Sequence, residues 1–184
     1  MSNVQLSQIN SGVAVAYARA TDTPVAVRSG ATDELLSGIQ EINPPPVAGG
    51  ATLAVTAAMS GQPILLNEAA GTVATLPAAT GSGNWYDFIV TVALTSAANK
   101  ILPHSGSDYM QGLVIGENAG TCKSFASDGT TNKSIQMPYA GTQPSGGYIG
   151  DHFRVRDIAA NKWQVTGAFQ AGVTATTPFS TSAT

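Results

Sequence analysis

Short apolar runs recur along most of the chain, and turn-forming residues separate them. From Ala51 onward each run has the length of a strand, and Gly, Pro, Asn, Asp and Ser stand between the runs. No part of this region keeps the period of an amphipathic helix. The pattern predicts about ten strands, at residues 51–57, 63–66, 72–76, 86–93, 100–102, 112–115, 121–125, 133–137, 148–158 and 162–169.

Two stretches, residues 75–90 and 150–167, carry this pattern most clearly. Each is interpreted as a strand, a tight turn and a second strand. Every other side chain of a strand faces the same side of its sheet. We therefore expect the aromatic rings of Phe88 and Phe153 to point inward.

Strand-length runs with frequent turn signals are typical of an all-β fold, here an antiparallel β-sandwich or jelly roll. Residues 67–71 and the pair Asp128-Gly129 are predicted hairpin turns, because Asp-Gly suits a turn that needs positive φ. A weak internal repeat fits two sheets, since a strand ending in Pro, a loop with Gly and a strand with an aromatic residue occur at 75–90 and again at 136–155. A chance match in a chain rich in Pro and Gly is the alternative explanation.

Residues 1–48 differ from the rest of the chain. They combine short extended pieces with a segment, residues 32–42, that is compatible with one or two helical turns. The run Pro44-Pro45-Pro46 then ends any helix and favours an extended backbone. We divide the chain into an N-terminal arm with a Pro-rich linker, residues 1–48, and a β-sandwich or jelly-roll body, residues 49–184. A long loop inside one domain is the alternative.

The composition describes an unusual surface. Hydrophobic residues make up 43% of the chain but charged residues only 10%, whereas about 25% is average for a soluble domain. A chain this poor in charge either presents many hydroxyl and amide groups to water or covers much of its exterior with other subunits. We favour the second explanation.

Charge, cysteine content and hydropathy exclude several classes of function. The formal net charge is −3 and the Lys and Arg residues are spread along the chain, so no basic stripe is present for nucleic acid. Cys122 is the only cysteine, which excludes an intrachain disulfide or a zinc thiolate cluster. We expect Cys122 to be a small buried hydrophobic residue, with a reactive thiol as the alternative.

No apolar run reaches the length of a membrane-spanning helix, and the first residues lack the basic and apolar regions of a signal peptide. We therefore expect no membrane partner. We also expect the chain to be made in a cytoplasm and to leave it only as part of a particle.

Residues that perform catalysis are few and scattered. Of the histidines, His104 and His152, only the second has an adjacent acid, and that acid, Asp151, would point to the opposite face of a strand. The acids stand singly, without the spacing of a calcium loop, so we expect no metal. No helix follows the turn at residues 81–83, so it is not a nucleotide-binding loop. We expect no catalytic residue, no cofactor and no enzymatic activity.

A family likeness lies in the turns and core positions of the body. The segments at residues 74–83, 86–90, 150–159, 162–167 and 175–180 resemble structural proteins of tailed-bacteriophage virions, in particular head decoration (cement) proteins. The resemblance covers residues 51–184 and involves no reactive group. Related modules also occur in phage fibres.

The resemblance implies a β-sandwich or jelly-roll module that assembles as a homotrimer on the exterior of the capsid. Its partner would be the major capsid protein, whose neighbouring subunits it would clamp after the shell expands. We expect residues 2–42 to serve as an arm that adds a strand to the sheet edge of a neighbour. The expected apolar contacts of this arm are Leu6, Val13, Val15 and Tyr17.

A fibre module that binds glycan on the host surface is the alternative function. It would use exposed aromatic residues, for which Trp85, Tyr86 and Trp163 are the candidates. At alternating strand positions such residues are more typical of core or subunit-interface anchors. An exposed groove lined by aromatic residues and acids would favour the fibre module.

Overall fold

The computed structural model describes residues 26–29, 32–35, 45–139, 141 and 143–184. The chain divides into two compact units, Met1–Pro44 and Pro45–Thr184. The division falls inside the proline run of the predicted linker, and each unit is described by itself.

In the first unit, β1 (Ala26–Ser29) pairs antiparallel with β2 (Thr32–Leu35). The prediction of a helical turn is therefore wrong at residues 32–35. A lone helical turn leaves most of its backbone groups unpaired, whereas these residues pair with a second strand. The predicted arm contacts Leu6, Val13, Val15 and Tyr17 lie outside the described residues.

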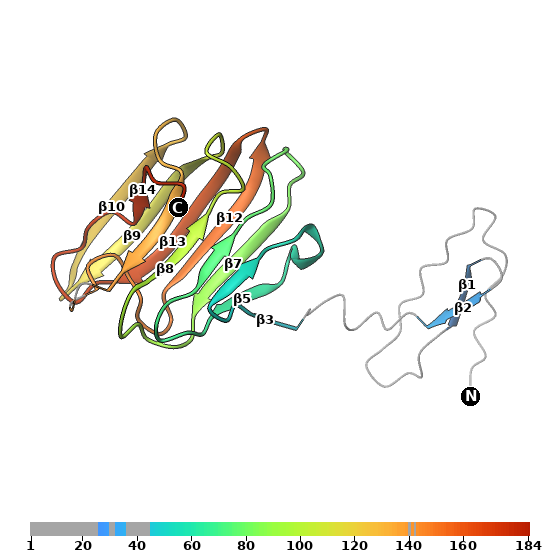
Figure 1. The fold of residues 1–184 in the computed structure, drawn as a ribbon, viewed down its shortest axis with the longest axis horizontal. Helices are drawn as coiled ribbons and strands as arrows, with labels where there is room; N and C mark the ends of the chain where they lie inside the picture. Colours follow the sequence, from blue (N-terminus) through green and yellow to red (C-terminus); the bar gives the residue numbers. More distant parts are fainter. Residues whose placement is uncertain (1–25, 30–31, 36–44, 140, 142) are drawn as a thin grey trace, which may run out of the picture. The chain divides into compact units, whose positions relative to one another are not determined.

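The second unit, which we call the body, is a sandwich of two sheets (Figure 1). The seven-stranded large sheet has the order β10 (Thr121–Asp128), β9 (Tyr109–Asn118), β13 (Lys162–Gln170), β12 (His152–Ala159), β7 (Trp85–Val90), β5 (Pro63–Leu66) and β3 (Val47–Ala48). The five-stranded small sheet has the order β14 (Phe179–Ser180), β11 (Ser134–Pro138), β8 (Ala98–Leu102), β6 (Val73–Thr75) and β4 (Thr52–Ala54).

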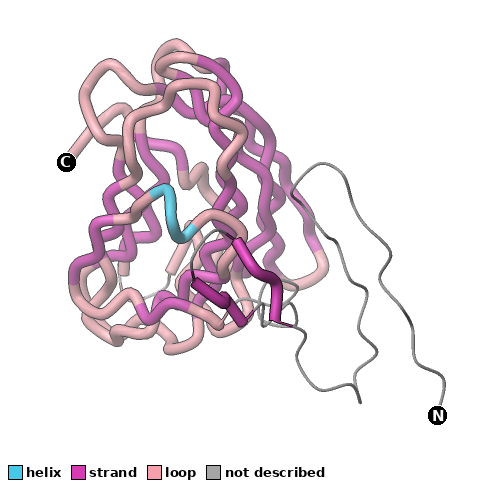
Figure 2. The backbone as a smooth tube through the Cα atoms, turned by 90° about the vertical axis from the view of Figure 1, so that its right-hand side faces the viewer, coloured by secondary structure: helices cyan, strands magenta, loops and turns pink. Residues whose placement is uncertain are grey.

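The body confirms the all-β sandwich, and each of the predicted strands overlaps a strand of the structure. Within the described residues the sole helical element is η1 (Ala57–Met59), a 3-10 turn drawn in cyan in Figure 2. The body also includes β3, whose residues the sequence assigned to the linker.

Strand directions differ from the predicted antiparallel arrangement. From β3 to β8 the chain alternates between the two sheets, and strands two apart in sequence within this range lie side by side and run in the same direction. The pairs β3–β5 and β5–β7 in the large sheet, and β4–β6 and β6–β8 in the small sheet, are parallel for this reason. In addition, β13 runs parallel to β9.

This alternation also corrects the predicted hairpins. Residues 67–71 connect β5 to β6, and the segment after Asp128 connects β10 to β11, so both cross between sheets. The stretch 75–90 likewise crosses from β6 to β7, whereas 150–167 contains a true hairpin of β12 and β13. Turn composition predicts a change of direction but not the strand to which the chain returns.

The internal repeat has a structural counterpart. The connections β6 to β7 and β11 to β12 both cross from the small sheet to the large sheet. Moreover, β7 and β12 lie side by side, and Phe88 is the cross-strand partner of Phe153.

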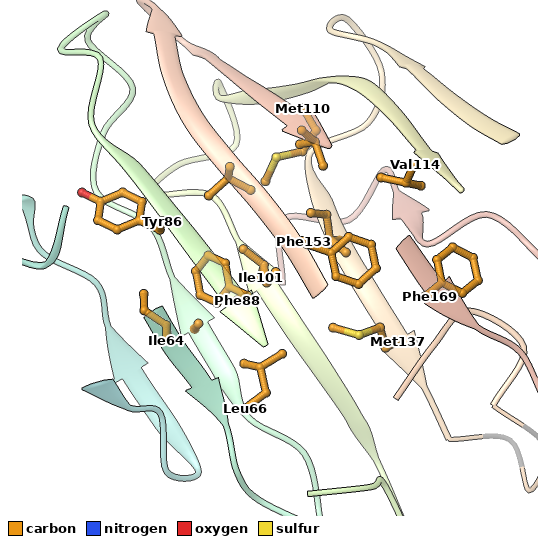
Figure 3. Close-up of a cluster of buried hydrophobic side chains, with 14 of the residues drawn as sticks. Ile64, Leu66, Tyr86, Phe88, Ile101, Met110, Val114, Met137, Phe153 and Phe169 are labelled. Carbon is orange, nitrogen blue, oxygen red and sulfur yellow. The ribbon is translucent and has the colours of Figure 1, made fainter. Parts of the chain in front are cut away.

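The core lies between the sheets, and Figure 3 shows it as a continuous cluster. Alternate residues of β7 and β12 are buried, which confirms that Phe88 and Phe153 point inward. Ile101 from β8 and Met137 from β11 meet these rings from the small sheet. Burying each large apolar side chain contributes about 1.5–3 kcal/mol.

Candidate protein-binding surface

Asp157, near the end of β12, accepts hydrogen bonds from the turn at residues 80–82. The donors are the backbone N–H groups of Thr80 (3.0 Å), Gly81 (2.7 Å) and Ser82 (3.0 Å) and the hydroxyls of Thr80 (3.2 Å) and Ser82 (2.7 Å). Burial raises the pKa of Asp157, but these hydrogen bonds together hold it below its ordinary value. The turn is an anion-binding nest whose anion is the protein's own carboxylate.

Asp151 has a similar structural role just before β12. Its carboxylate accepts hydrogen bonds from the backbone N–H groups of Gly147 (2.7 Å), Tyr148 (2.9 Å) and Gln170 (2.8 Å). Burial raises the pKa of Asp151 in spite of these bonds. The neighbouring His152 is exposed on the outer side of the sheet. The two residues point to opposite faces, and Asp151 binds backbone rather than an imidazole.

Asp108, which precedes β9, is the remaining buried acid of the described residues. Burial raises its pKa, while the N–H groups of Ala79 and Ser105 and the nearby His104 act in the opposite direction. His104 itself is exposed. The described ranges contain no group of three or more His, Cys, Asp or Glu that could hold a metal ion. One acid with one exposed histidine is not a catalytic set.

The three aromatic residues considered for glycan binding, Trp85, Tyr86 and Trp163, do not form a sugar-binding platform. Tyr86 and Trp163 are fully buried, with ring centroids 6.0 Å apart in the core. Trp85 is half-buried, and the Arg154 guanidinium covers its ring at 4.6 Å from the centroid. Arg154 is held there by two hydrogen bonds of 2.6 Å to Asp87 on the neighbouring strand.

The outer face of the large sheet, which points away from the core, is poor in charge where β10, β9 and β13 meet. Leu113 and Ile115 on β9 are 49% and 47% exposed. Their cross-strand partners on either side are small residues or bear hydroxyls: Ser124, Ala126, Thr166 and Ala168. An exposed apolar surface with few charges is typical of a surface that binds another protein.

The strand β10 forms one edge of the large sheet, and Cys122 lies on it. Cys122 is exposed, so the prediction that it is buried is wrong. Its cross-strand partner is Glu117, which places it on the outer face rather than over the core. Sequence reasoning missed both this edge and the outer face, because neither contains a reactive or periodic signal.

No known protein family, curated protein sequence or solved structure matches the chain. None of the helical residues that the structure describes forms a span long and apolar enough to cross a membrane. The fold and the composition of its surfaces are therefore the observations that bear on function.

Proposed function

We propose that the chain is a non-enzymatic structural protein of a tailed-bacteriophage virion, a decoration protein on the exterior of the capsid. It binds the outer surface of the head and stabilises contacts between subunits of the major capsid protein. The observation that carries the proposal is the outer face around Leu113 and Ile115, where two exposed apolar side chains have only uncharged cross-strand partners. The resemblance to head decoration proteins supplies the location.

The interior supports a structural role. The buried acids Asp151 and Asp157 are occupied by backbone N–H groups of the chain itself. Their hydrogen bonds tie neighbouring loops to β12. Loops held in this way and a face with few charges suit adhesion between protein surfaces, where little charge has to be desolvated.

A decoration protein acts by mass action. A ligand that binds the expanded shell and not its precursor stabilises the expanded shell by the free energy of that binding. We propose an assembly of three chains, because a multivalent ligand gains affinity when its copies contact several capsid subunits together.

The fibre module remains the second candidate class, but the aromatic residues give it little support. Tyr86 and Trp163 lie in the core, and Trp85 is covered on one face by Arg154. A glycan would have to bind elsewhere on the body.

The proposal is tested by sedimenting the full chain with undecorated heads in the expanded and precursor forms. We expect saturable binding to expanded heads, at least about tenfold weaker binding to precursor heads, and a higher melting temperature of the decorated shell. Leu113→Glu, which adds a charge to the outer face, should weaken binding, whereas Ile149→Glu adds the same charge to a loop residue that is 65% exposed. Equal loss in both variants, or no binding to either form of head, contradicts the proposal.

A further inference from the structure

The edge strand β10 has backbone groups that bond to nothing else in the described chain. It joins β9 through Ala119 and Gly120, which both have positive φ, at 48° and 82°. This is the two-residue turn in which the flanking residues, Asn118 and Thr121, exchange backbone hydrogen bonds. Hydrogen-bonded and non-hydrogen-bonded pairs then alternate along the hairpin.

That alternation identifies the free groups. Odd-numbered residues of β10 direct their backbone toward β9, and the even-numbered residues direct theirs to the open edge: Cys122, Ser124, Ala126 and Asp128. Two backbone hydrogen bonds of β9 support this assignment. The N–H of Met110, an even-numbered residue, donates to the carbonyl of Asn132, in the segment that follows β10. The carbonyl of Glu117, an odd-numbered residue, accepts from the N–H of Ala171, in the segment that follows β13. No backbone hydrogen bond from elsewhere in the described residues reaches these four positions.

We propose that β10 pairs in the antiparallel direction with β10 of a second copy of this chain. Free edges of this length are templates for strand pairing. The other edge strands of the body are β3 and β14 with two residues each and β4 with three, whereas β10 has eight. Only a second β10 matches its length among these edges. A two-fold contact also covers both edges at once and so closes, whereas pairing with a different edge would continue into a filament.

The register follows from which residues can face each other. In an antiparallel pair, two residues exchange hydrogen bonds only if both point their N–H and C=O groups toward the other strand. Even-numbered residues of one β10 therefore pair with even-numbered residues of the second copy. Among these registers, the one that pairs Ser124 with Ala126 of the second copy places Phe125 opposite its own counterpart. Phe125 is half-buried and stacks on Phe169, with centroids 5.9 Å apart. Facing aromatic rings stabilise a strand pair.

The charges agree with this register. It places Lys123 opposite Ser127 and Asp128 opposite Cys122, so no like charges face each other. Moving the register by two residues in one direction pairs Lys123 with Phe125 of the second copy. Moving it by two more residues pairs Lys123 with Lys123 of the second copy, which charge repulsion disfavours.

Pairing through β10 joins two chains. An assembly of three chains would therefore be held by another contact, and β10 would connect two such assemblies.

Because Cys122 is the only cysteine and is exposed, the unchanged full chain can carry a single spin label there. In the proposed register the two Cys122 positions are offset by about six residues, so their Cα atoms lie roughly 20 Å apart. Pulsed electron paramagnetic resonance should give a distance distribution centred near that value. A distance near 13 Å or less would overturn the register, and the absence of dipolar coupling at high protein concentration would overturn the pairing.

A matched pair of variants tests the same contact by charge. Ser124 and Ala126 are exposed, so both variants should fold, which circular dichroism checks. In S124K/A126E, each new Lys faces a Glu of the second copy, whereas in S124K/A126K it faces another Lys. We expect the dissociation constant of the Lys/Lys variant to be at least about tenfold higher than that of the Lys/Glu variant. Equal association of the two variants would contradict the proposed register.

Discussion

Asp151 and Asp157 are buried near the two ends of β12, and each accepts hydrogen bonds from the backbone of a loop. At Asp157 the bonds outweigh the effect of burial, and the pKa is lowered; at Asp151 burial prevails, and the pKa is raised. Asp157 shares the inward face of β12 with Phe153 and Val155. Its partner turn lies far away in sequence, so no local pattern could have identified the nest.

Asp157→Asn should destabilise the body near neutral pH by at least about 2 kcal/mol, because an amide cannot accept all these hydrogen bonds as a carboxylate does. The pKa of Asp157 is lowered from 3.8 in the folded protein. Its ionised form therefore contributes stability above that value, and the contribution is lost as the pH falls through the folded pKa. The difference between wild type and variant should shrink in urea unfolding at about pH 3 compared with about pH 7. A difference that grows in acid would contradict this role.

Phe153→Ala removes a fully buried ring from β12 and should cost about 3–5 kcal/mol, because the two sheets cannot fully close the cavity. Ile158→Ala on the same strand is the control, since Ile158 is 44% exposed, and its cost should stay within about 0.5 kcal/mol. Denaturant titration measures both. Equal midpoints for the two variants would show that the register of β12 has been assigned to the wrong face.

The elements of the body were largely predictable, and their partners were not. Runs with period two located each predicted strand, but the two-residue strands β3 and β14 are too short to produce a pattern. Strand direction also escaped prediction, because the crossing between sheets after each of β3 to β8 is decided by packing across the core. Cys122 was misplaced because the apolar run located its strand but not the face to which each side chain points, and Cys122 lies on the outer face.

Gly112→Ala tests the parallel junction of β9 and β13. A Cβ at Gly112 would lie 1.9 Å from the carbonyl oxygen of Val165, so the two strands would have to separate. We expect a loss of at least about 2 kcal/mol and faster hydrogen exchange in β9 and β10. Gly106→Ala is the control, because its Cβ would meet only the Lys133 ammonium, at 3.8 Å. Unchanged exchange in Gly112→Ala would mean that β9 does not depend on this junction.

At the scale of the molecule, the chain divides after Pro44, and both sheets of the sandwich belong to the second unit. Deleting residues 1–42 should therefore leave the melting temperature of the body nearly unchanged. The truncated protein should no longer bind heads if the arm makes the decisive contact. Binding is measured by sedimentation with expanded heads. Undiminished binding would refute the prediction that the arm makes the decisive contact, and would leave the outer face of the large sheet as the contact.

We propose that this chain holds protein surfaces together on the outside of a phage head. A cryo-electron map of the intact virion tests it most directly. We expect density for the two-sheet body on the capsid exterior, with the face around Leu113 and Ile115 against capsid subunits. Density for the body at the tip of a fibre, or its absence from the particle, would show that the chain is not a decoration protein of the head.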